Sequence, residues 1–301
     1  MIYICLNSLS MQLLVFIIIY PLLWIISILP FRLLYIFSDF VYFIVYHIIG
    51  YRKKTVRENL LIAFPHLSDK ERLDIEKKSF HHLCDMFLEM IKTISITDKQ
   101  IEERFTYSNL EVYKDLEKKG KSITLLVSHY ASYEWVISMN KKISHKGYGI
   151  YKQIKNPYFD KLVKKIRSRF KAYLITTKET KKTIAKNYKN EVLGVYGFAS
   201  DQTPRWSDNM YWHTFFGQTT AIHYGAESLA KEFDMNMIYM KVRKVKRGYY
   251  EASFEVLTED VKSVPNYKIS EDFMSRVEKQ IIEAPEYYLW THKRWKHKKY
   301  D

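Results

Sequence analysis

Apolar and polar residues are distributed very unevenly along the chain, and the N-terminal part is the extreme case. No side chain between residues 1 and 31 is charged, and most of this stretch reads LLVFIIIYPLLWIISILPF. About 20 apolar residues span the hydrocarbon core of a bilayer. A cleaved signal peptide would begin with basic residues and end at a small-residue cleavage site, and neither is visible. We therefore predict an uncleaved transmembrane anchor over residues 1–31, in which Pro21 marks either a kink or a re-entrant dip.

The next stretch, residues 32–54, is aromatic rather than uniformly apolar. The run RLLYIFSDFVYFIVYHIIG is rich in Tyr and Phe and contains only two charges, which favours a helix lying at the membrane interface or packed on the anchor. The basic run YRKKTVR follows directly. Because basic residues beside an apolar segment stay on the cytoplasmic side, we expect residues 55–301 to form a cytoplasmic domain.

Beyond residue 54 the spacing of apolar residues alternates between helical and strand-like. Residues 55–95 are helical in pattern, with Ser68 as an N-cap. Strand-like segments then alternate with helix-like ones, which predicts an α/β fold with a mostly parallel central sheet covered by helices. The strand-like segments are residues 123–127, 147–152, 172–176, 192–200, 235–245 and 248–257, and the helix-like ones are residues 156–170, 178–188, 221–233 and 268–285.

The sharpest chemical feature lies where the strand-like run ITLLV ends. His129 follows this run, which has the composition of a strand buried on both faces, and Glu134 comes five residues later. We expect His129 at the carboxyl end of a parallel strand, where open α/β sheets bind ligands, and Glu134 in the first turn of the next helix. A carboxylate so close can hold one imidazole nitrogen and leave the other to take a proton from a hydroxyl. By itself, a histidine followed by an acid is a weak signal of a catalytic pair, and a packing role for His129 is the alternative.

Composition narrows the chemistry further. Cys5 and Cys84 are the only cysteines, so the chain has no disulfide framework, and no Cys and His residues have the spacing of a structural zinc site. Neither a GxSxG elbow nor a phosphate-binding glycine motif is present, which argues against a serine hydrolase and a nucleotide-binding enzyme. The net charge of +15 arises after Gly50, since residues 1–50 contain one basic and one acidic side chain. This surplus fits anionic lipid, a phosphorylated glycolipid head group or an acidic carrier protein.

Four ordered blocks of sequence carry a family resemblance. The blocks are HYASYE, NPYFDKLVKKIRSRF, DQTP followed by FFGQTT and GAESLAKE, and PEYYLWTHKRWK. Together they resemble the lipid A biosynthesis late acyltransferases (lauroyl or myristoyl acyltransferases) in the form common in Bacteroidetes, a branch of the lysophospholipid acyltransferase superfamily. The resemblance extends from about Leu33 to the C-terminus. The chain departs from the family pattern at Ser132 and Tyr133, where Asn-Trp is usual, and at Lys171, where a glycine often follows the basic block.

The resemblance implies a glycerolipid acyltransferase-like fold and a membrane-bound O-acyltransferase. Such an enzyme moves a fatty acyl chain from an acyl thioester to a hydroxyl of a lipid A precursor or related lipid, without a cofactor or a metal ion. It implies that His129 is the general base and that Glu134 orients the imidazole. Arg167 and Arg169 match the family's basic block, and Asp201 matches the acid of its third block and would pair with one of them. Either guanidinium, or a backbone N–H after His129, would stabilise the oxyanion.

The resemblance and the charge pattern also suggest partners and a location. We expect an acyl carrier protein thioester as donor, with acyl-coenzyme A as the alternative, because Lys161, Lys164 and other basic residues cluster in one segment after His129. We expect a monomer in the cell inner membrane, with its catalytic domain on the cytoplasmic face. The acceptor stays open among a Kdo-lipid A precursor, a lysophospholipid and an aminolipid.

The rival class of function is a non-catalytic, membrane-tethered protein that binds lipid or nucleic acid. The tail WTHKRWKHKKY mixes aromatic and basic residues, as do segments that grip single-stranded nucleic acid. Because the N-terminal anchor brings this tail near a membrane, side chains that snorkel to the bilayer surface are the better explanation. We therefore predict an enzyme that does not bind nucleic acid.

Overall fold

The structure is a computed structural model that describes residues 2–297. Its α-helices are α1 (Ile2–Ile28), α2 (Phe31–Phe43), α3 (Lys53–Ala63), α4 (Asp69–Lys92), α5 (Asp98–Arg104), α6 (Leu110–Glu117), α7 (Pro157–Ser168), α8 (Thr180–Lys189), α9 (Gly225–Glu232) and α10 (Lys268–Glu283). A π-helix, η1 (Ile44–Ile49), and two 3-10 helices, η2 (Trp135–Lys141) and η3 (Pro285–Tyr287), complete the helical part. The strands are β1 (Phe105–Tyr107), β2 (Ile123–Val127), β3 (Lys146–Tyr151), β4 (Ala172–Thr176), β5 (Gly194–Ala199), β6 (Tyr211–Phe215), β7 (Gln218–Ile222), β8 (Asn236–Lys246) and β9 (Tyr249–Thr258).

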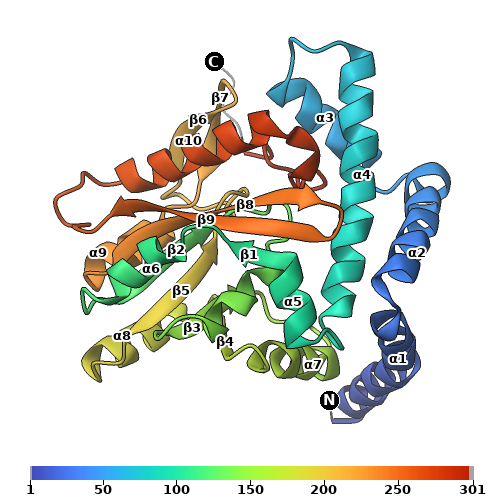
Figure 1. The fold of residues 1–301 in the computed structure, drawn as a ribbon, viewed down its shortest axis with the longest axis horizontal. Helices are drawn as coiled ribbons and strands as arrows, with labels where there is room; N and C mark the ends of the chain where they lie inside the picture. Colours follow the sequence, from blue (N-terminus) through green and yellow to red (C-terminus); the bar gives the residue numbers. More distant parts are fainter. Residues whose placement is uncertain (1, 298–301) are drawn as a thin grey trace.

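The central sheet has seven strands in the order β1-β9-β8-β2-β5-β3-β4. Neighbouring strands are parallel except β8 and β9, which form an antiparallel pair. β6 and β7 form a separate antiparallel hairpin. Figure 1 shows α10 on one side of the β8–β9 pair and α6 on the other, so helices cover both faces of the sheet. The predicted α/β fold with a mostly parallel sheet is therefore confirmed.

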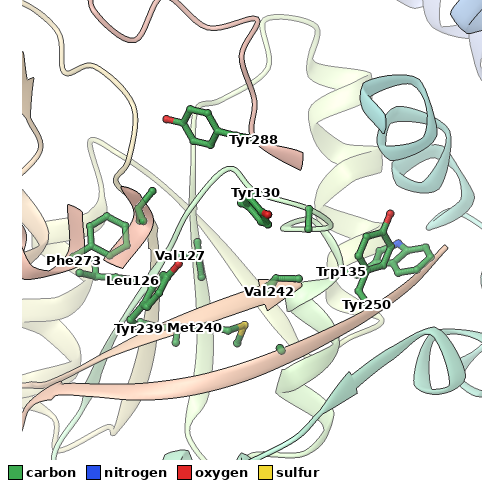
Figure 2. Close-up of a cluster of buried hydrophobic side chains, with 14 of the residues drawn as sticks. Leu126, Val127, Tyr130, Trp135, Tyr239, Met240, Val242, Tyr250, Phe273 and Tyr288 are labelled. Atoms are coloured by element: carbon green, nitrogen blue, oxygen red, sulfur yellow. The ribbon is translucent and has the colours of Figure 1, made fainter. Parts of the chain in front are cut away.

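β2 lies inside this sheet because its sequence suits burial on both faces. All five residues of ITLLV are buried, and the strand pairs with β8 on one side and with β5 on the other. Figure 2 shows Leu126 and Val127 near Tyr239 and Met240 of β8, within a cluster of buried apolar side chains. Burying an apolar side chain of this size stabilises the fold by roughly 1.5–3 kcal/mol. The strand is thus a firm base for the residues that follow it.

The segment after β2 differs from the prediction. Residues 129–134 form an irregular turn, and the helix that follows, η2, is a 3-10 helix that begins at Trp135. Ala131 has a φ of 50°, and its N–H donates to the carbonyl of Tyr287 at 2.9 Å. Tyr130 forms an antiparallel bridge with Tyr288. A segment from the far end of the chain therefore shapes this turn, and no local pattern of residues reveals such a contact.

The turn between α7 and β4 explains one departure from the family pattern. Lys171 has a φ of 57°, and its N–H donates to the carbonyl of Ser168 at 3.0 Å. Glycine adopts this left-handed conformation freely, whereas another L-residue loses roughly 1–2 kcal/mol there. The chain therefore keeps the turn that a glycine would make, at some cost in stability.

The two N-terminal helical segments are long and apolar enough to cross a membrane. The stretch Met11–Ile28 of α1 has a mean hydropathy of 2.4, and Phe31–Ile49 has a mean hydropathy of 1.5. Most of the side chains of α1 from residue 11 onward are exposed, including Leu14 and Ile18. Such a large apolar surface has no counterpart on ordinary soluble domains, and it suggests that α1 anchors the protein to a membrane.

α2 docks on the domain through the buried side chains of Phe31, Leu34 and Ser38 and through polar contacts. Ser38 Oγ donates to Asp85 Oδ1 at 2.8 Å. Arg247, from the end of the β8–β9 pair, donates to Asp39 Oδ1 at 2.6 Å and to Asp85 Oδ1 at 2.7 Å. Ile36 and other apolar side chains on α2 are exposed. Such a helix, packed on the domain on one side and with apolar side chains exposed on the other, fits an interfacial segment, which stays our prediction for residues 32–54.

Candidate active site

β2 and β5 end side by side, and the candidate site lies just beyond their ends. The two strands are parallel, with Val127 opposite Ala199. His129 and Asp201 each come two residues later, so they meet at the carboxyl edge of the sheet. Asp201 Oδ1 accepts a hydrogen bond from the His129 backbone N–H at 2.9 Å and lies 2.8 Å from His129 Nδ1. The predicted position of His129 is confirmed, and its carboxylate partner is Asp201.

The acid of this pair is enclosed and the base is accessible. The side chain of Asp201 is 0% exposed, while that of His129 is 23% exposed. Gln202 Nε2 donates to Asp201 Oδ2 at 2.9 Å and to the Tyr288 hydroxyl at 3.0 Å. With Nδ1 held by Asp201, the imidazole is fixed in orientation and Nε2 is left for a substrate.

The electrostatics of the pair favour an ion pair between His129 and Asp201. Burial lowers the pKa of His129, but the negative charge of Asp201, its hydrogen bond to the ring and the charge of Glu134 together outweigh burial and raise that pKa. Burial would raise the pKa of Asp201, but the charge of His129 and the hydrogen bonds from it lower that pKa instead. The protonated imidazole is therefore stabilised, as a base that accepts a proton during a reaction requires.

Glu134 occupies a different position from the one predicted. It caps the start of η2, and its Oε2 accepts a hydrogen bond from Arg167 Nη2 at 2.5 Å. No hydrogen bond joins Glu134 to His129 within the described part of the chain, although its charge raises the pKa of His129. The hydrogen bond predicted from the imidazole to Glu134 is thus replaced by one from the imidazole Nδ1 to Asp201. The predicted pairing of Asp201 with an arginine is wrong for the same reason.

The two arginines of the basic block separate in the structure. Arg167, in the last turn of α7, pairs with Glu134, and its side chain is 20% exposed. Arg169 donates to the carbonyls of Ile94 at 2.7 Å and Ile96 at 2.8 Å, in the segment that follows α4. Arg169 therefore ties α7 to the end of α4, whereas Arg167 contacts the segment that follows His129.

The backbone N–H groups directly after His129 are already engaged. The N–H of Tyr130 donates to the Ser128 carbonyl at 2.8 Å, and the N–H of Ala131 donates to the Tyr287 carbonyl. These two groups are thus poor candidates for binding an oxyanion, because a donor must be free to face the charge that develops. Arg167 is the better candidate among the donors that the sequence suggested.

The C-terminal tail contributes residues that sequence reasoning missed. Trp290, Arg294 and Trp295 are buried, with 2%, 1% and 5% exposure. Arg294 Nη1 donates to the Ala221 carbonyl at 3.2 Å. Tyr288, in the same tail, reaches Gln202 beside Asp201. The interpretation of this tail as an exposed aromatic and basic surface is wrong for these tryptophans, because they pack into the core. The block PEYYLW contains more aromatic residues than a surface segment needs, and this was the sequence signal for burial.

Among residues 2–297, no group of three or more His, Cys, Asp and Glu side chains is arranged to hold a metal ion. The free thiol of Cys84 is buried in α4, and burial raises its pKa to about 12. It is therefore a packing residue and not a nucleophile.

Fold and site together define an α/β protein with a histidine–carboxylate pair at the carboxyl edge of its sheet and apolar helices at its N-terminus. Sequence comparison gives the family. The family described as bacterial lipid A biosynthesis acyltransferase matches residues 7–297, and the chain belongs to it. The protein is therefore an acyltransferase of lipid A biosynthesis, which transfers an acyl chain to a lipid A precursor.

Two relatives from other bacteria match most of the chain. The lipid A biosynthesis lauroyltransferase of Escherichia coli (strain K12) is 24% identical over 275 residues, which is 91% of this chain and 89% of the relative. The lipid A biosynthesis acyltransferase of Haemophilus influenzae is 24% identical over 262 residues, which is 80% of this chain and 76% of the relative. The family match over residues 7–297 includes the whole sheet and the candidate site.

Proposed function

We propose that His129 is the general base of the acyl transfer and that the reaction proceeds by direct attack of a lipid hydroxyl on an acyl thioester. His129 Nε2 takes the hydroxyl proton while the hydroxyl oxygen bonds to the thioester carbonyl carbon. The tetrahedral intermediate collapses with loss of the thiolate. The thiolate then takes the proton from the imidazolium. The observation that carries this proposal is the hydrogen bond from His129 Nδ1 to the buried Asp201, which leaves Nε2 for the substrate.

Glu134 and Arg167 form the second half of the proposed site. The guanidinium of Arg167 has donors besides the one that Glu134 engages, and these are suited to the oxyanion of the intermediate. The charge of Glu134 supports the imidazolium of His129, since it raises the pKa of that residue. Asp201 takes the orienting role that sequence resemblance suggested for Glu134.

The test of this function is an analysis of lipids in cells and in a purified system. A deletion strain is expected to accumulate a lipid A precursor that lacks one acyl chain, of lauroyl or myristoyl type, detected by mass spectrometry of total lipids. Wild-type protein should restore the chain and the His129→Ala variant should not. Loss of an acyl chain from phospholipids or aminolipids instead, with lipid A unchanged, would contradict the proposed acceptor.

We also propose that the donor is an acyl carrier protein thioester rather than acyl-coenzyme A. On α7, Lys164 pairs with Asp160 at 3.1 Å, whereas Lys161 and Lys165 are exposed. An acidic carrier attracted to these lysines would be delivered beside Arg167 at the end of the same helix. Such steering raises the association rate and weakens as salt increases.

The donor proposal predicts a selective kinetic defect. Substituting Lys161→Glu and Lys165→Glu together should raise KM for the carrier-bound donor about tenfold at low salt, with a much smaller effect on acyl-coenzyme A. Steady-state kinetics at two ionic strengths measures this. The matched control is the double variant Lys186→Glu and Lys189→Glu on α8, which changes the net charge equally and should leave KM nearly unaltered. Equal effects on both donors would contradict the proposal.

The N-terminal helices support a proposal about the location of the protein. α1 is held by the domain at two points: Asn156 Nδ2 donates to the Gln12 carbonyl at 2.9 Å, and Lys92 Nζ donates to the Ser27 carbonyl at 2.7 Å. The domain therefore sits against the anchor, with α7 beside it. We propose that the protein is a monomer on the cytoplasmic face of the inner membrane, where both an acyl carrier protein and the lipid acceptor are accessible.

A further inference from the structure

A second histidine lines a small cavity beside the proposed base. His82, on α4, is 5% exposed, and it borders the same cavity as His129. The cavity has a volume of about 10 Å³, which is room for about one water-sized group. Its other walls are largely apolar and come from α4 and the C-terminal segment: Ser79, Phe80, Leu83, Met86 and residues 287–291. A polar ring in such a setting needs an explanation, because buried polar groups in proteins are normally hydrogen-bonded.

Lys244 determines which nitrogen of His82 carries the proton. Its Nζ lies 3.3 Å from His82 Nδ1 and 3.6 Å from Asp85 Oδ2, and the side chain of Lys244 is 8% exposed. An ammonium group has donors only, so Nδ1 must accept and Nε2 must carry the hydrogen. Burial lowers the pKa of His82 well below its ordinary value, and the charge of Lys244 lowers it further, so the ring is neutral.

The Nε2–H of His82 is a buried donor that makes no hydrogen bond of good geometry in the described part of the chain. The backbone of Ala131, in the turn after His129, makes a weak contact with the ring that raises the pKa of His82 slightly against the larger lowering effect of burial. Lys244 occupies the Nδ1 side and is not part of the cavity wall, so Nε2 is the nitrogen toward the cavity. An unsatisfied buried donor is destabilising unless a ligand completes it.

We propose that His82 is a catalytic hydrogen-bond donor, whose Nε2–H binds the carbonyl oxygen of the acyl thioester in the cavity that it shares with His129, as a second donor to the oxyanion besides Arg167. The inference builds on the proposed role of His129 as the base. As the acceptor hydroxyl attacks, the π electrons of the carbonyl move onto this oxygen, and a fixed neutral donor stabilises the negative charge without losing its proton. The cavity admits a single oxygen atom, so the acyl chain lies outside it.

Kinetics of two His82 variants test the proposal. His82→Leu removes the donor and should lower kcat about 10²-fold, with KM for the thioester changed less than about threefold, because the bond strengthens in the transition state. His82→Gln retains an N–H at the position of Nε2 and should keep kcat within tenfold of wild type. Neighbouring His81, whose side chain is 37% exposed and pairs with Asp39, supplies the control. The variant His81→Gln should leave kcat within twofold.

Several outcomes would overturn the proposal. If His82→Leu kept more than a third of wild-type kcat, the cavity would hold only a water molecule or nothing relevant to catalysis. If His82→Leu and His82→Gln lost kcat equally, together with thermal stability, the role of His82 would be structural. A nitrogen NMR spectrum that assigned the ring proton to Nδ1, or found the ring charged at neutral pH, would also refute it. An active His129→Ala variant would contradict the base itself, which separates that failure from a failure at His82.

Discussion

Replacing His129 by alanine is expected to lower kcat for acyl transfer by about 10²–10⁴-fold, which is the usual contribution of a positioned general base. Asp201→Asn should cause a loss of similar size. The asparagine has the same shape, but it has no charge to stabilise the imidazolium, and its amide can no longer fix the tautomer that leaves Nε2 unprotonated. Both variants should keep the wild-type thermal midpoint within a few degrees, since the β2 and β5 strands do not depend on the pair. Single-turnover kinetics with the acyl donor measures the effect.

The pH dependence distinguishes this pair from a merely structural contact. Asp201 holds the pKa of His129 above its ordinary value against the opposing effect of burial. The base must be unprotonated before the reaction, so kcat/KM should rise with pH through this raised pKa. In Asp201→Asn the main raising influence is gone, and the acidic limb of the profile should move to lower pH. An acidic limb that stays in place would show that Asp201 does not tune His129.

The double variant His129→Ala/Asp201→Asn tests whether the two residues act in the same step. Residues that act as a unit show strong non-additivity. The double variant should therefore be scarcely slower than His129→Ala alone. A full multiplication of the two single losses would mean that Asp201 serves a separate step, such as binding the acceptor.

His129 could be predicted from sequence because a buried apolar strand ends directly before it, and strand ends are local features. Its partner, Asp201, could not be predicted in this way. Asp201 also follows a strand by two residues, but the pairing of Val127 with Ala199 depends on β2 and β5 being neighbours, and strand order is not a local property. The sequence neighbour Glu134 was favoured instead, on the assumption of a regular helix after His129. The contact between Ala131 and Tyr287 removes that helix and leaves Glu134 to Arg167.

In the rest of the chain, too, local features could be predicted, whereas features that depend on contacts between distant segments could not. The helix in the apolar N-terminal stretch and the segments of β4 and α7 were predicted correctly because composition and spacing alone define them. The buried tail was misjudged because Arg294 is exceptional: its guanidinium is enclosed, with carbonyl and hydroxyl partners from β7, and charged residues are rarely so buried. No local pattern singles out His82, because only the fold brings Lys244 against its ring.

Disrupting the ion pair between Glu134 and Arg167 is expected to cause the second large loss of activity. Both side chains are partly buried, at 19% and 20% exposure, and Oε2 lies 2.5 Å from Nη2. Arg167→Ala removes a donor to the oxyanion and should lower kcat about 10²–10³-fold with a small change in KM. Arg167→Lys keeps the charge but lacks the planar fork, so it should recover only part of the loss.

Glu134→Ala should be almost as damaging as Arg167→Ala, because the freed guanidinium turns from the site and the negative charge near His129 disappears. If the two residues act as one positioning unit, the double variant should be no more than about threefold slower than the worse single variant. Glu134 is the smallest of the influences that raise the pKa of His129, so Glu134→Gln should shift the acidic limb of kcat/KM less than Asp201→Asn does. A larger shift in Glu134→Gln than in Asp201→Asn would mean that Glu134, and not Asp201, is the carboxylate that supports the imidazolium during turnover, which would require the turn at residues 129–134 to rearrange when substrate binds.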